Sequence, residues 1–203
     1  DVKSDQAIPA LGAAQYRVGF FAGCVASTIF ANMDRATIRV LIRNGCHIII
    51  PGSQVCCGAV HEHNGCREMV RKLAKRNIDS FLRYDLDAII VNAGGCGSML
   101  KGYAELLNDD PEYVDKAKVF SGKVKDINEF LGQISLNTRF GELNVTITYQ
   151  DPCHLAHVQG VKNQPRRLLK SIPGVKFVEM KDASQCCGGA GTYVIENYDL
   201  SMR

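Results

Sequence analysis

The sequence predicts an α/β fold of two repeated βαβ-type units, with short parallel sheets flanked by helices. Short apolar runs alternate along the chain with segments of helical periodicity. Pairs that contain glycine or proline close several of these segments. The same alternation begins again near residue 145. Strands that alternate with helices of this length are typical of right-handed βαβ units and a parallel sheet.

The repeated pattern divides the chain into three parts. Residues 1–15 are expected to be a linker, residues 16–140 the first unit and residues 141–203 the second. Short apolar runs predict the strands of both units. These runs span residues 16–21, 46–50, 88–91, 145–149 and 175–180.

Helices are predicted between these strands. The helix after the first strand is expected to end at Asn44-Gly45, and the basic helix near residues 164–170 before Pro173-Gly174. Polar helices are predicted over residues 98–136. The residues expected on the buried face of the first helix are Ile29, Met33, Ala36, Val40 and Leu41. For the second helix they are Cys66, Met69, Val70, Leu73, Ile78 and Phe81.

Nine cysteines are the strongest functional signal in the chain. Cys24, the pair in Cys56-Cys57-Gly58 and the cysteine of Gly94-Gly95-Cys96-Gly97 each follow a predicted strand of the first unit. The first two motifs return as Cys153 and Cys186-Cys187-Gly188. Thirty-one residues lie between the first two motifs of one unit and thirty-two between those of the other. Such a repeat indicates a duplicated metal or cluster site, because several thiolates must meet at one point.

The strand pattern predicts where the cysteines lie. Binding loops of a parallel sheet follow the carboxyl ends of its strands, so the three cysteine loops of the first unit should share one edge. Cys46 opens a strand and is expected at the opposite edge as a small buried residue, and Cys66 is expected in the core. The counterpart of Cys96 would fall about twenty residues past Arg203, so the second unit is expected to be truncated.

The adjacent cysteines favour an iron–sulfur cluster over zinc. Neighbouring side chains of an extended backbone point to opposite faces, so an adjacent pair grips a single ion poorly. No C-x-x-C, the usual knuckle of zinc sites, occurs in the sequence. A cluster holds several irons and can take adjacent cysteines on different ones, with four thiolates for a 4Fe-4S type. The predicted ligands are Cys24, Cys56, Cys57 and Cys96, with Cys153, Cys186 and Cys187 in the second unit.

Composition argues against other classes of function. The net charge is only +3, and no basic stripe with interleaved aromatic residues indicates nucleic-acid binding. The apolar runs are too short to span a bilayer, and no signal-peptide pattern opens the chain. The odd number of cysteines favours a reducing, cytoplasmic compartment over a disulfide framework. The glycine-rich segments fit neither a P-loop nor a dinucleotide-binding motif.

Four motifs resemble the cysteine-rich CCG domains of heterodisulfide reductase (its B subunit) and of iron–sulfur subunits of glycolate, lactate and glycerol-3-phosphate dehydrogenases. The resemblance is greatest to the glycolate oxidase (glycolate dehydrogenase) iron–sulfur subunits. It extends over nearly the whole chain from Arg17 to Arg203. The motifs are Phe-Ala-Gly-Cys at 21–24, Pro-Gly-Ser-Gln-Val-Cys-Cys-Gly-Ala at 51–59, Asn-Ala-Gly-Gly-Cys-Gly-Ser at 92–98 and Asp-Pro-Cys-His-Leu-Ala-His at 151–157, with Asp-Ile-Asn-Glu-Phe-Leu at 126–131.

The resemblance implies an electron-transfer subunit of a flavin-linked 2-hydroxy-acid dehydrogenase that oxidises glycolate to glyoxylate. An FAD-containing partner subunit would carry out the oxidation, and this chain would relay the electrons towards quinone. The resemblance therefore implies no catalytic residue of its own, no activity in isolation, and a cytoplasmic location, peripheral on the inner face of the cell membrane through the complex. The ferredoxin-like region usual in the family, with its C-x2-C-x2-C-x3-C-P runs, is absent from this sequence.

Two alternative functions stay open. One is a heterodisulfide-reductase-like thiol/disulfide redox catalyst, although that motif ends in C-x-x-C where this chain has Cys96-Gly97-Ser98-Met99. The other is a zinc-stabilised interaction module without redox activity.

Histidines follow two of the cysteine motifs. His154 and His157 come after Cys153 and are candidates for hydrogen bonds that tune a cluster. His61 and His63 after the Cys56-Cys57 pair are weaker candidates, and the alternative for all four is an ordinary structural role.

Overall fold

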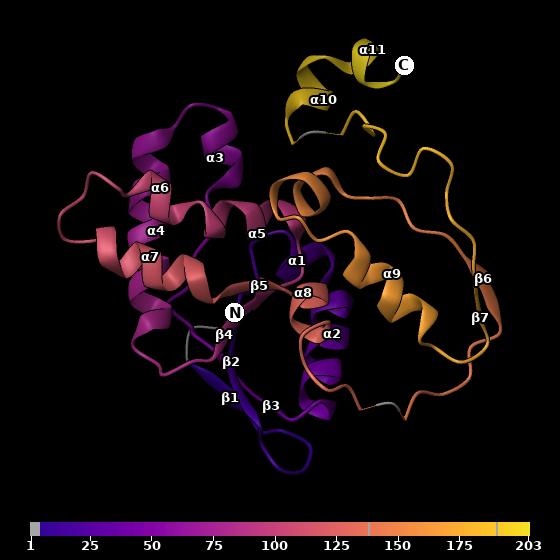
Figure 1. Cartoon of the computed structure of the whole chain (residues 1–203). Helices are drawn as coiled ribbons and strands as arrows, with labels where there is room; N and C mark the ends of the chain where they lie inside the picture. The colour runs from indigo at the N-terminus through magenta and orange to yellow at the C-terminus, as the bar shows by residue number, and fades with distance from the viewer. Residues whose placement is uncertain (1–4, 138, 190) are drawn as a thin grey trace.

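The first unit is an α/β/α sandwich built on a five-stranded sheet of order β1-β3-β2-β4-β5 (Figure 1). The structure, a computed structural model, describes residues 5–137, 139–189 and 191–203. The α/β fold predicted from the sequence is confirmed. Its strands are β1 (Gln6–Ile8), β2 (Tyr16–Phe20), β3 (Cys46–Ile50), β4 (Ala88–Val91) and β5 (Val124–Asp126).

The parallel strands β2, β3, β4 and β5 are the reason that the cysteine loops share one edge. Val18 of the central strand lies opposite Ile48 of β3 and Ala88 of β4, and all three side chains are buried. Strands covered by helices on both faces carry such continuous apolar runs.

Two strands were missed by the sequence prediction. β1 forms within the stretch expected to be a linker and pairs antiparallel with β3, with Ala7 opposite Ile49. β5 forms within the stretch expected to be helical, because Val124 and its neighbours extend the parallel edge next to β4.

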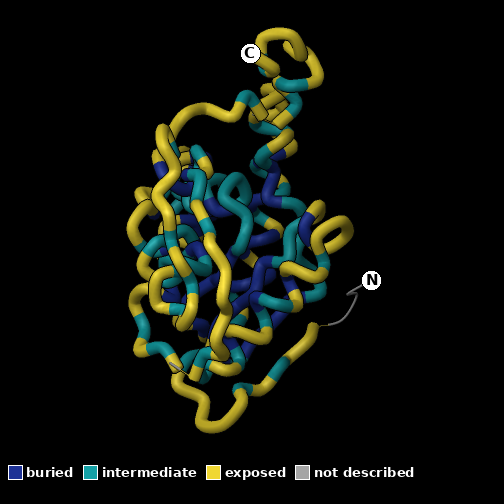
Figure 2. Tube along the Cα trace, turned by 90° about the vertical axis from the view of Figure 1, so that its right-hand side faces the viewer, coloured by how far each residue is buried: buried dark blue, intermediate teal, exposed yellow. Residues whose placement is uncertain are grey.

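Helices cover both faces of this sheet. One face is packed by α4 (Arg67–Leu82), α5 (Gly94–Lys101), α6 (Tyr103–Leu106) and α7 (Val114–Lys123), around an apolar core that includes Phe81, Tyr103 and Phe120. The other face is packed by α2 (Ala31–Arg43) and α8 (Ile127–Leu131) through Leu41 and Phe130. Short helices α1 (Ala26–Ile29) and α3 (Ala59–His63) lie in the cysteine loops. Figure 2 shows the buried residues concentrated between these layers.

The second unit is a smaller βαβ arrangement beside the first. Its strands β6 (Val145–Ile147) and β7 (Val175–Phe177) pair in parallel, somewhat shorter than predicted. Between them lie the π-helix η1 (His154–Val158) and α9 (Asn163–Lys170), followed later by α10 (Tyr193–Glu196) and α11 (Tyr198–Ser201). η1 packs on α5, and α9 packs on α8. These two contacts dock the second unit on the first.

The predicted buried face of the first helix is confirmed at Leu41 but is otherwise largely wrong. Ile29, Met33 and Val40 are exposed, whereas Asp34 and Thr37 face the interior with Leu41. The polar pair is buried because Asn92, at the end of β4, donates its amide to Asp34 Oδ1 (2.8 Å) and Thr37 Oγ1 (3.1 Å).

The prediction for Cys66 is also wrong, while that for Cys46 is confirmed. Cys66 is exposed, because α4 begins one residue later and its side chain precedes the buried helix face. Cys46 is fully buried at the start of β3, and burial raises the pKa of its thiol to about 12. Over the described residues, no helix has both the length and the apolar character needed to cross a membrane.

Candidate functional site at the cysteine edge

The four cysteines of the first unit lie next to one another. Cys24 follows β2, Cys56 and Cys57 follow β3, and Cys96 lies in the first turn of α5 after β4. The Sγ atoms of Cys24 and Cys56 are 3.5 Å apart. Cys57 and Cys96 lie close enough to influence the pKa of each other and of Cys56, so the four thiols form one group. All nine cysteines of the protein are free thiols.

Contacts among the thiols set their acidity. The hydrogen bond with Cys57, followed by burial, raises the pKa of Cys56, and burial raises the pKa of Cys24. The pKa of Cys96 is lowered, because Cys57 hydrogen-bonds to it. Cysteine binds a metal as thiolate, so metal binding here would release several protons.

Glycine is required after the cysteine pair for two reasons. Gly58 has φ 89°, in the left-handed region that favours glycine, and a Cβ there would lie 2.9 Å from Val70 Cγ1. Its N–H points at Cys56 Sγ, 3.4 Å away. Gly188 repeats this geometry, with φ 73° and an N–H donated to Cys186 Sγ at 3.5 Å. The two Cys-Cys-Gly motifs therefore share a backbone conformation.

Asn77 of α4 supports the Cys56-Cys57 loop through hydrogen bonds. Its Oδ1 accepts the Val55 N–H at 2.8 Å, and its Nδ2 donates to the carbonyl of Cys56 at 3.2 Å and to the hydroxyl of Tyr103 at 3.1 Å. The Tyr103 hydroxyl in turn donates to the carbonyl of Cys57 at 2.7 Å. Burial raises the pKa of Tyr103, so its hydroxyl remains a donor. Both side chains are completely buried, so the loop rests on a fixed polar support.

Gln54 joins the first two cysteine loops. Its Oε1 accepts the Ala22 N–H at 3.0 Å, and its Nε2 donates to the carbonyls of Phe20 (3.3 Å) and Pro51 (3.1 Å). A cavity of about 360 Å³ opens beside it, and both Cys24 and Cys56 line this cavity. The thiols on this side are therefore reachable from solvent.

Neither Asn77 nor Tyr103 was singled out from the sequence. Asn77 shares the buried face of α4 with Val70, Ala74, Ile78 and Phe81, and an amide among apolar residues at helical spacing is the signal that could have found it. Tyr103 carried no such signal, because a buried tyrosine is common in a core.

The first cysteine of the second unit lies against the last cysteine loop of the first. Cys153 immediately precedes η1. Ser98 of α5 donates its hydroxyl to the carbonyl of His154 at 3.1 Å, and Gln159 Nε2 donates to the carbonyl of Gly94 at 2.9 Å. The structure thus brings the Cys153 loop to the Cys96 helix.

The second unit gathers its own cysteines less closely. Cys186 and Cys187 are both exposed, and no hydrogen bond joins either to Cys153 in the described part of the chain. The segment that follows them reaches back to α3, where Asn64 Nδ2 lies 3.5 Å from Thr192 Oγ1. The seven predicted ligands therefore fall into a contiguous set of four and a looser set of three.

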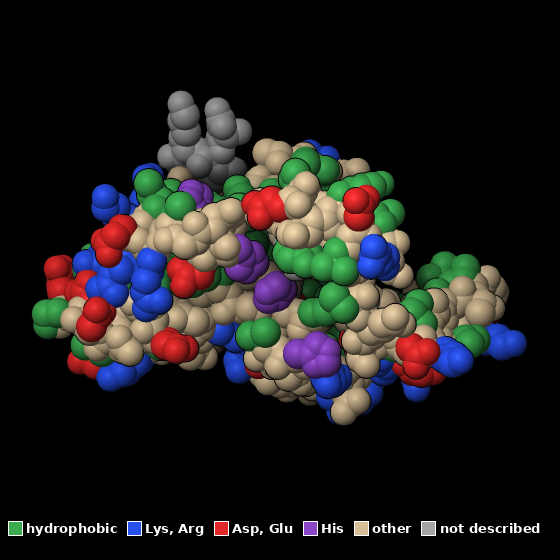
Figure 3. Space-filling view, turned by 90° about the horizontal axis from the view of Figure 1, so that it is seen from above, with side chains coloured by type: hydrophobic (Ala, Val, Ile, Leu, Met, Phe, Trp, Pro, Cys, Tyr) green, Lys and Arg blue, Asp and Glu red, His purple; other side chains and the backbone are tan. Residues whose placement is uncertain are grey.

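Histidines gather on the surface above the cysteine edge, as Figure 3 shows in a view of this face. The rings of His63 in α3 and His154 in η1 are stacked, with centroids 5.8 Å apart. Nδ1 of His61 is buried without a hydrogen-bond partner among the described residues. His157 is exposed. The two units therefore contribute histidines to one surface.

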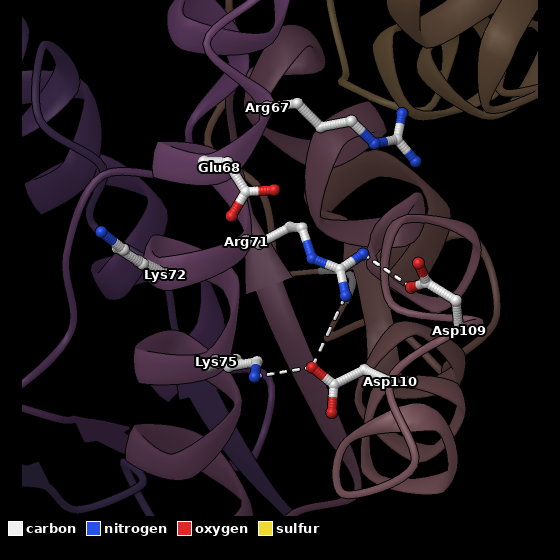
Figure 4. A pocket seen from close by; sticks show the side chains of 7 residues that line it. All are labelled: Arg67, Glu68, Arg71, Lys72, Lys75, Asp109 and Asp110. Carbon is white, nitrogen blue, oxygen red and sulfur yellow. Dashed lines mark hydrogen bonds and ion pairs between the residues drawn. The ribbon is translucent and has the colours of Figure 1, made fainter.

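Another cavity, of about 460 Å³, lies elsewhere and is lined by a network of ion pairs (Figure 4). Arg71 of α4 contacts Asp109 at 2.7 Å and Asp110 at 3.6 Å, and Lys75 contacts Asp110 at 2.6 Å. These pairs join α4 to the loop before α7. None of the cysteines lines this cavity, so it is separate from the thiol site.

The donor set fits an iron–sulfur cluster in the number of its thiols. In the part of the chain that the structure describes, no three His, Cys, Asp or Glu side chains are placed to bind one metal ion. Four thiols on three loops match the ligand number of an iron–sulfur cluster, whose irons are spread over several positions.

Known proteins resemble the chain over most of its length. It is 43% identical over 198 residues to the probable glycolate oxidase iron–sulfur subunit of Bacillus subtilis, covering 97% of this chain and 45% of that protein. It is 39% identical over 175 residues to the B subunit of the fumarate reductase (CoM/CoB) of Methanothermobacter marburgensis, covering 86% and 33%. It is 32% identical over 186 residues to lactate utilization protein A of Oceanobacillus iheyensis, covering 91% and 75%. The chain thus spans less than half the length of the first two of these relatives.

The two units also match a known domain. The profile of the cysteine-rich domain named CCG matches residues 18–101 and again residues 147–203, together more than half of the chain. The chain therefore belongs to the family of cysteine-rich CCG domain proteins.

Proposed function

We propose that this chain is an iron–sulfur electron-transfer subunit of a flavin-linked 2-hydroxy-acid dehydrogenase, with glycolate as the substrate of the whole complex. The observation that carries the proposal is the grouping of Cys24, Cys56, Cys57 and Cys96 at one sheet edge, where the Sγ atoms of Cys24 and Cys56 are 3.5 Å apart. The relatives named as iron–sulfur, fumarate reductase and lactate utilization proteins support an oxidoreductase complex.

These four cysteines would hold a cluster of the 4Fe-4S type. When bound, such a cluster supplies a site that accepts and releases one electron at a time. The chain's own residues fix the loops: Asn77 and Tyr103 support the Cys56-Cys57 pair, and Gln54 ties it to the Cys24 loop. Cys153, Cys186 and Cys187 are proposed as ligands of a second centre, and His154 and His157 as hydrogen-bonding neighbours of these centres.

The hydride chemistry would belong to a partner. We place it on an FAD-containing subunit, from which this chain would relay electrons towards quinone, because the chain carries no flavin or nicotinamide motif. The complex would be cytoplasmic and peripheral at the inner face of the cell membrane.

Anaerobic reconstitution of the chain tests the cofactor. Iron and sulfide in equal amounts, with an electron paramagnetic resonance signal after reduction, are expected, and stoichiometric zinc without iron would overturn the proposal. Cys57→Ala should abolish the signal, whereas Cys46→Ala, a change at the opposite edge, should keep it. Reduction by the flavoprotein subunit and glycolate then tests the proposed partner and substrate. Reaction of the loaded chain with small disulfides instead would favour the disulfide-reducing alternative.

A further inference from the structure

The outward face of α1 and α2 combines two stripes that the fold leaves uncovered. One is apolar: Ile29 is 73% exposed, Phe30 54% and Met33 42%. Ile29 and Met33 belong to the face that helical spacing placed in the core, and they point outward because Asp34 and Thr37 bind Asn92 instead. Exposed apolar residues that adjoin one another, unlike scattered single ones, mark interaction surfaces.

The second stripe is basic. Arg35, Arg39 and Arg43 follow one another at four-residue spacing on α2, so they line one side of the helix over about 12 Å. None of them forms a salt bridge within the described residues. Asp34, the single carboxylate between residues 18 and 58, is buried. The positive charge of this face is therefore not neutralised by its own helix.

This face adjoins the most accessible thiol of the site. Cys24 is exposed and directly precedes Val25 and α1, and the Thr28 hydroxyl of that helix bonds the Cys24 carbonyl at 3.0 Å. The cavity beside Cys24 is lined by Ser27 and Thr28 of the same helix. A molecule seated on α1 and α2 would therefore lie next to the thiol site, where transfer of an electron is fastest because the distance is shortest.

We propose that this α1–α2 face is the docking surface for an acidic electron-transfer protein, a step that rests on the proposed function. Uncompensated arginines steer and orient an acidic partner, and Met, Arg and aromatic residues are enriched at protein interfaces. Redox partners bind through small interfaces, which suits a patch of this extent. A lipid surface would gain nothing from the adjacent thiols, so a protein partner is favoured.

The test measures electron transfer to the chain with its cluster reconstituted, using reduced flavodoxin, an acidic flavoprotein, as the probe. Flavodoxin hydroquinone gives one electron to the oxidised centre and becomes the semiquinone. The double variant Arg35→Glu/Arg39→Glu should lower the second-order rate constant at least tenfold at low ionic strength, and the wild-type rate should fall with added salt. Ile29→Ser should lower it several-fold without changing the salt dependence.

A matched charge reversal is available on the opposite layer. Lys116→Glu/Lys118→Glu changes two exposed lysines of α7, across the sheet from α2, and should leave the rate unchanged. Equal rates for wild type and Arg35→Glu/Arg39→Glu would overturn the inference, while a normal cluster spectrum would leave the proposed function standing. Binding of phosphatidylglycerol vesicles that is lost in the arginine variant, with unchanged flavodoxin kinetics, would assign the face to a membrane and equally overturn it.

Discussion

Gly97 lies against the side-chain amide of Gln159, and a Cβ at position 97 would sit 2.7 Å from its Nε2. The residue after Cys96 is therefore glycine because the second unit occupies the space, and the backbone there needs no unusual conformation. The same amide donates to the carbonyl of Gly94 at 2.9 Å. One glutamine thus fits the second unit into the glycine-rich loop that presents a thiol of the first.

Alanine at position 97 should lower the free energy of unfolding when Gln159 is present and raise it when Gln159 is absent. In the wild type, Gly97→Ala displaces the amide from Gly94 and is expected to cost about 1–2 kcal/mol of unfolding free energy, the range for an unmade buried hydrogen bond. In a Gln159→Ala background the space is free, and alanine should stabilise α5 by up to about 1 kcal/mol, its helix-propensity gain. Urea unfolding of the four proteins measures this cycle, and additive effects would contradict the contact.

Asn77 is expected to matter more than its place in mid-helix suggests. Asn77→Ala removes three hydrogen bonds and leaves the Val55 N–H and the Cys56 carbonyl without their partner, at a cost of about 2–4 kcal/mol. Tyr103→Phe removes two hydrogen bonds, the one donated to the Cys57 carbonyl and the one accepted from Asn77 Nδ2, and should cost about 1–3 kcal/mol.

The second readout for these variants is the metal content after reconstitution. Asn77→Ala should take up less iron than wild type even under conditions where it is folded. Asn64→Ala is the matched control, because Asn64 caps the neighbouring helix α3 from an exposed position. Normal iron content in Asn77→Ala would show that the cysteine loop does not depend on this support.

The protein with Asp34 should be less stable at neutral pH than the Asp34→Asn variant. Burial raises the pKa of Asp34 above its ordinary value of 3.8, against a smaller lowering by the Asn92 hydrogen bond. The folded state therefore holds a proton on Asp34 that the unfolded state has lost, and stability falls as pH rises through that interval. Asp34→Asn keeps an acceptor for Asn92 and removes this loss.

Urea unfolding at two pH values tests the role of Asp34. Asp34→Asn should be more stable than wild type at pH 7, and the difference should shrink as the pH is lowered towards 4. A constant difference across this range would mean that Asp34 does not titrate between the folded and unfolded states.

The sequence was a good guide to the central strands and a poor one to the helix beside them. Residues 46–50 and 88–91 form β3 and β4 as predicted, because strands covered on both faces must be apolar throughout. The periodicity of α2 misled, since Asn92 binds the polar pair Asp34 and Thr37 across 55 residues or more. Helical spacing shows that a helix has two faces, and only such tertiary contacts decide which one is buried.

Some cysteine positions could likewise be predicted from the sequence pattern, and others could not. The edge position of Cys24, Cys56, Cys57 and Cys96 follows from the parallel direction of the strands before them, which the sequence pattern predicts. The predicted burial of Cys66 required that this residue lie within the helix. α4 begins at Arg67, one residue later, so Cys66 lies outside it. The docking of η1 on α5 depends on Gln159 and Ser98, whose partners are more than 50 residues away and leave no local pattern.

Arg166 should be the residue on which the second unit depends most. Its guanidinium forms two hydrogen bonds with the buried carboxylate of Asp151, at 2.6 and 3.2 Å, and a further one to Glu179 at 2.8 Å. It thereby ties α9 to the loop that carries Cys153 and to the segment after β7. Arg166→Ala would leave the Asp151 charge buried and unpaired, with an expected cost of about 3–5 kcal/mol.

Hydrogen exchange distinguishes a local effect from a global one. Amides of residues 145–180 should lose protection in Arg166→Ala, whereas those of β2 to β4 keep it, because the first unit has its own core. Arg166→Lys keeps the charge without the bidentate geometry, so its amide protection should fall between that of wild type and that of Arg166→Ala. Uniform loss of protection over both units would mean that the second unit has no separate stability, and that Arg166 supports the whole fold through the contacts of α9 with α8.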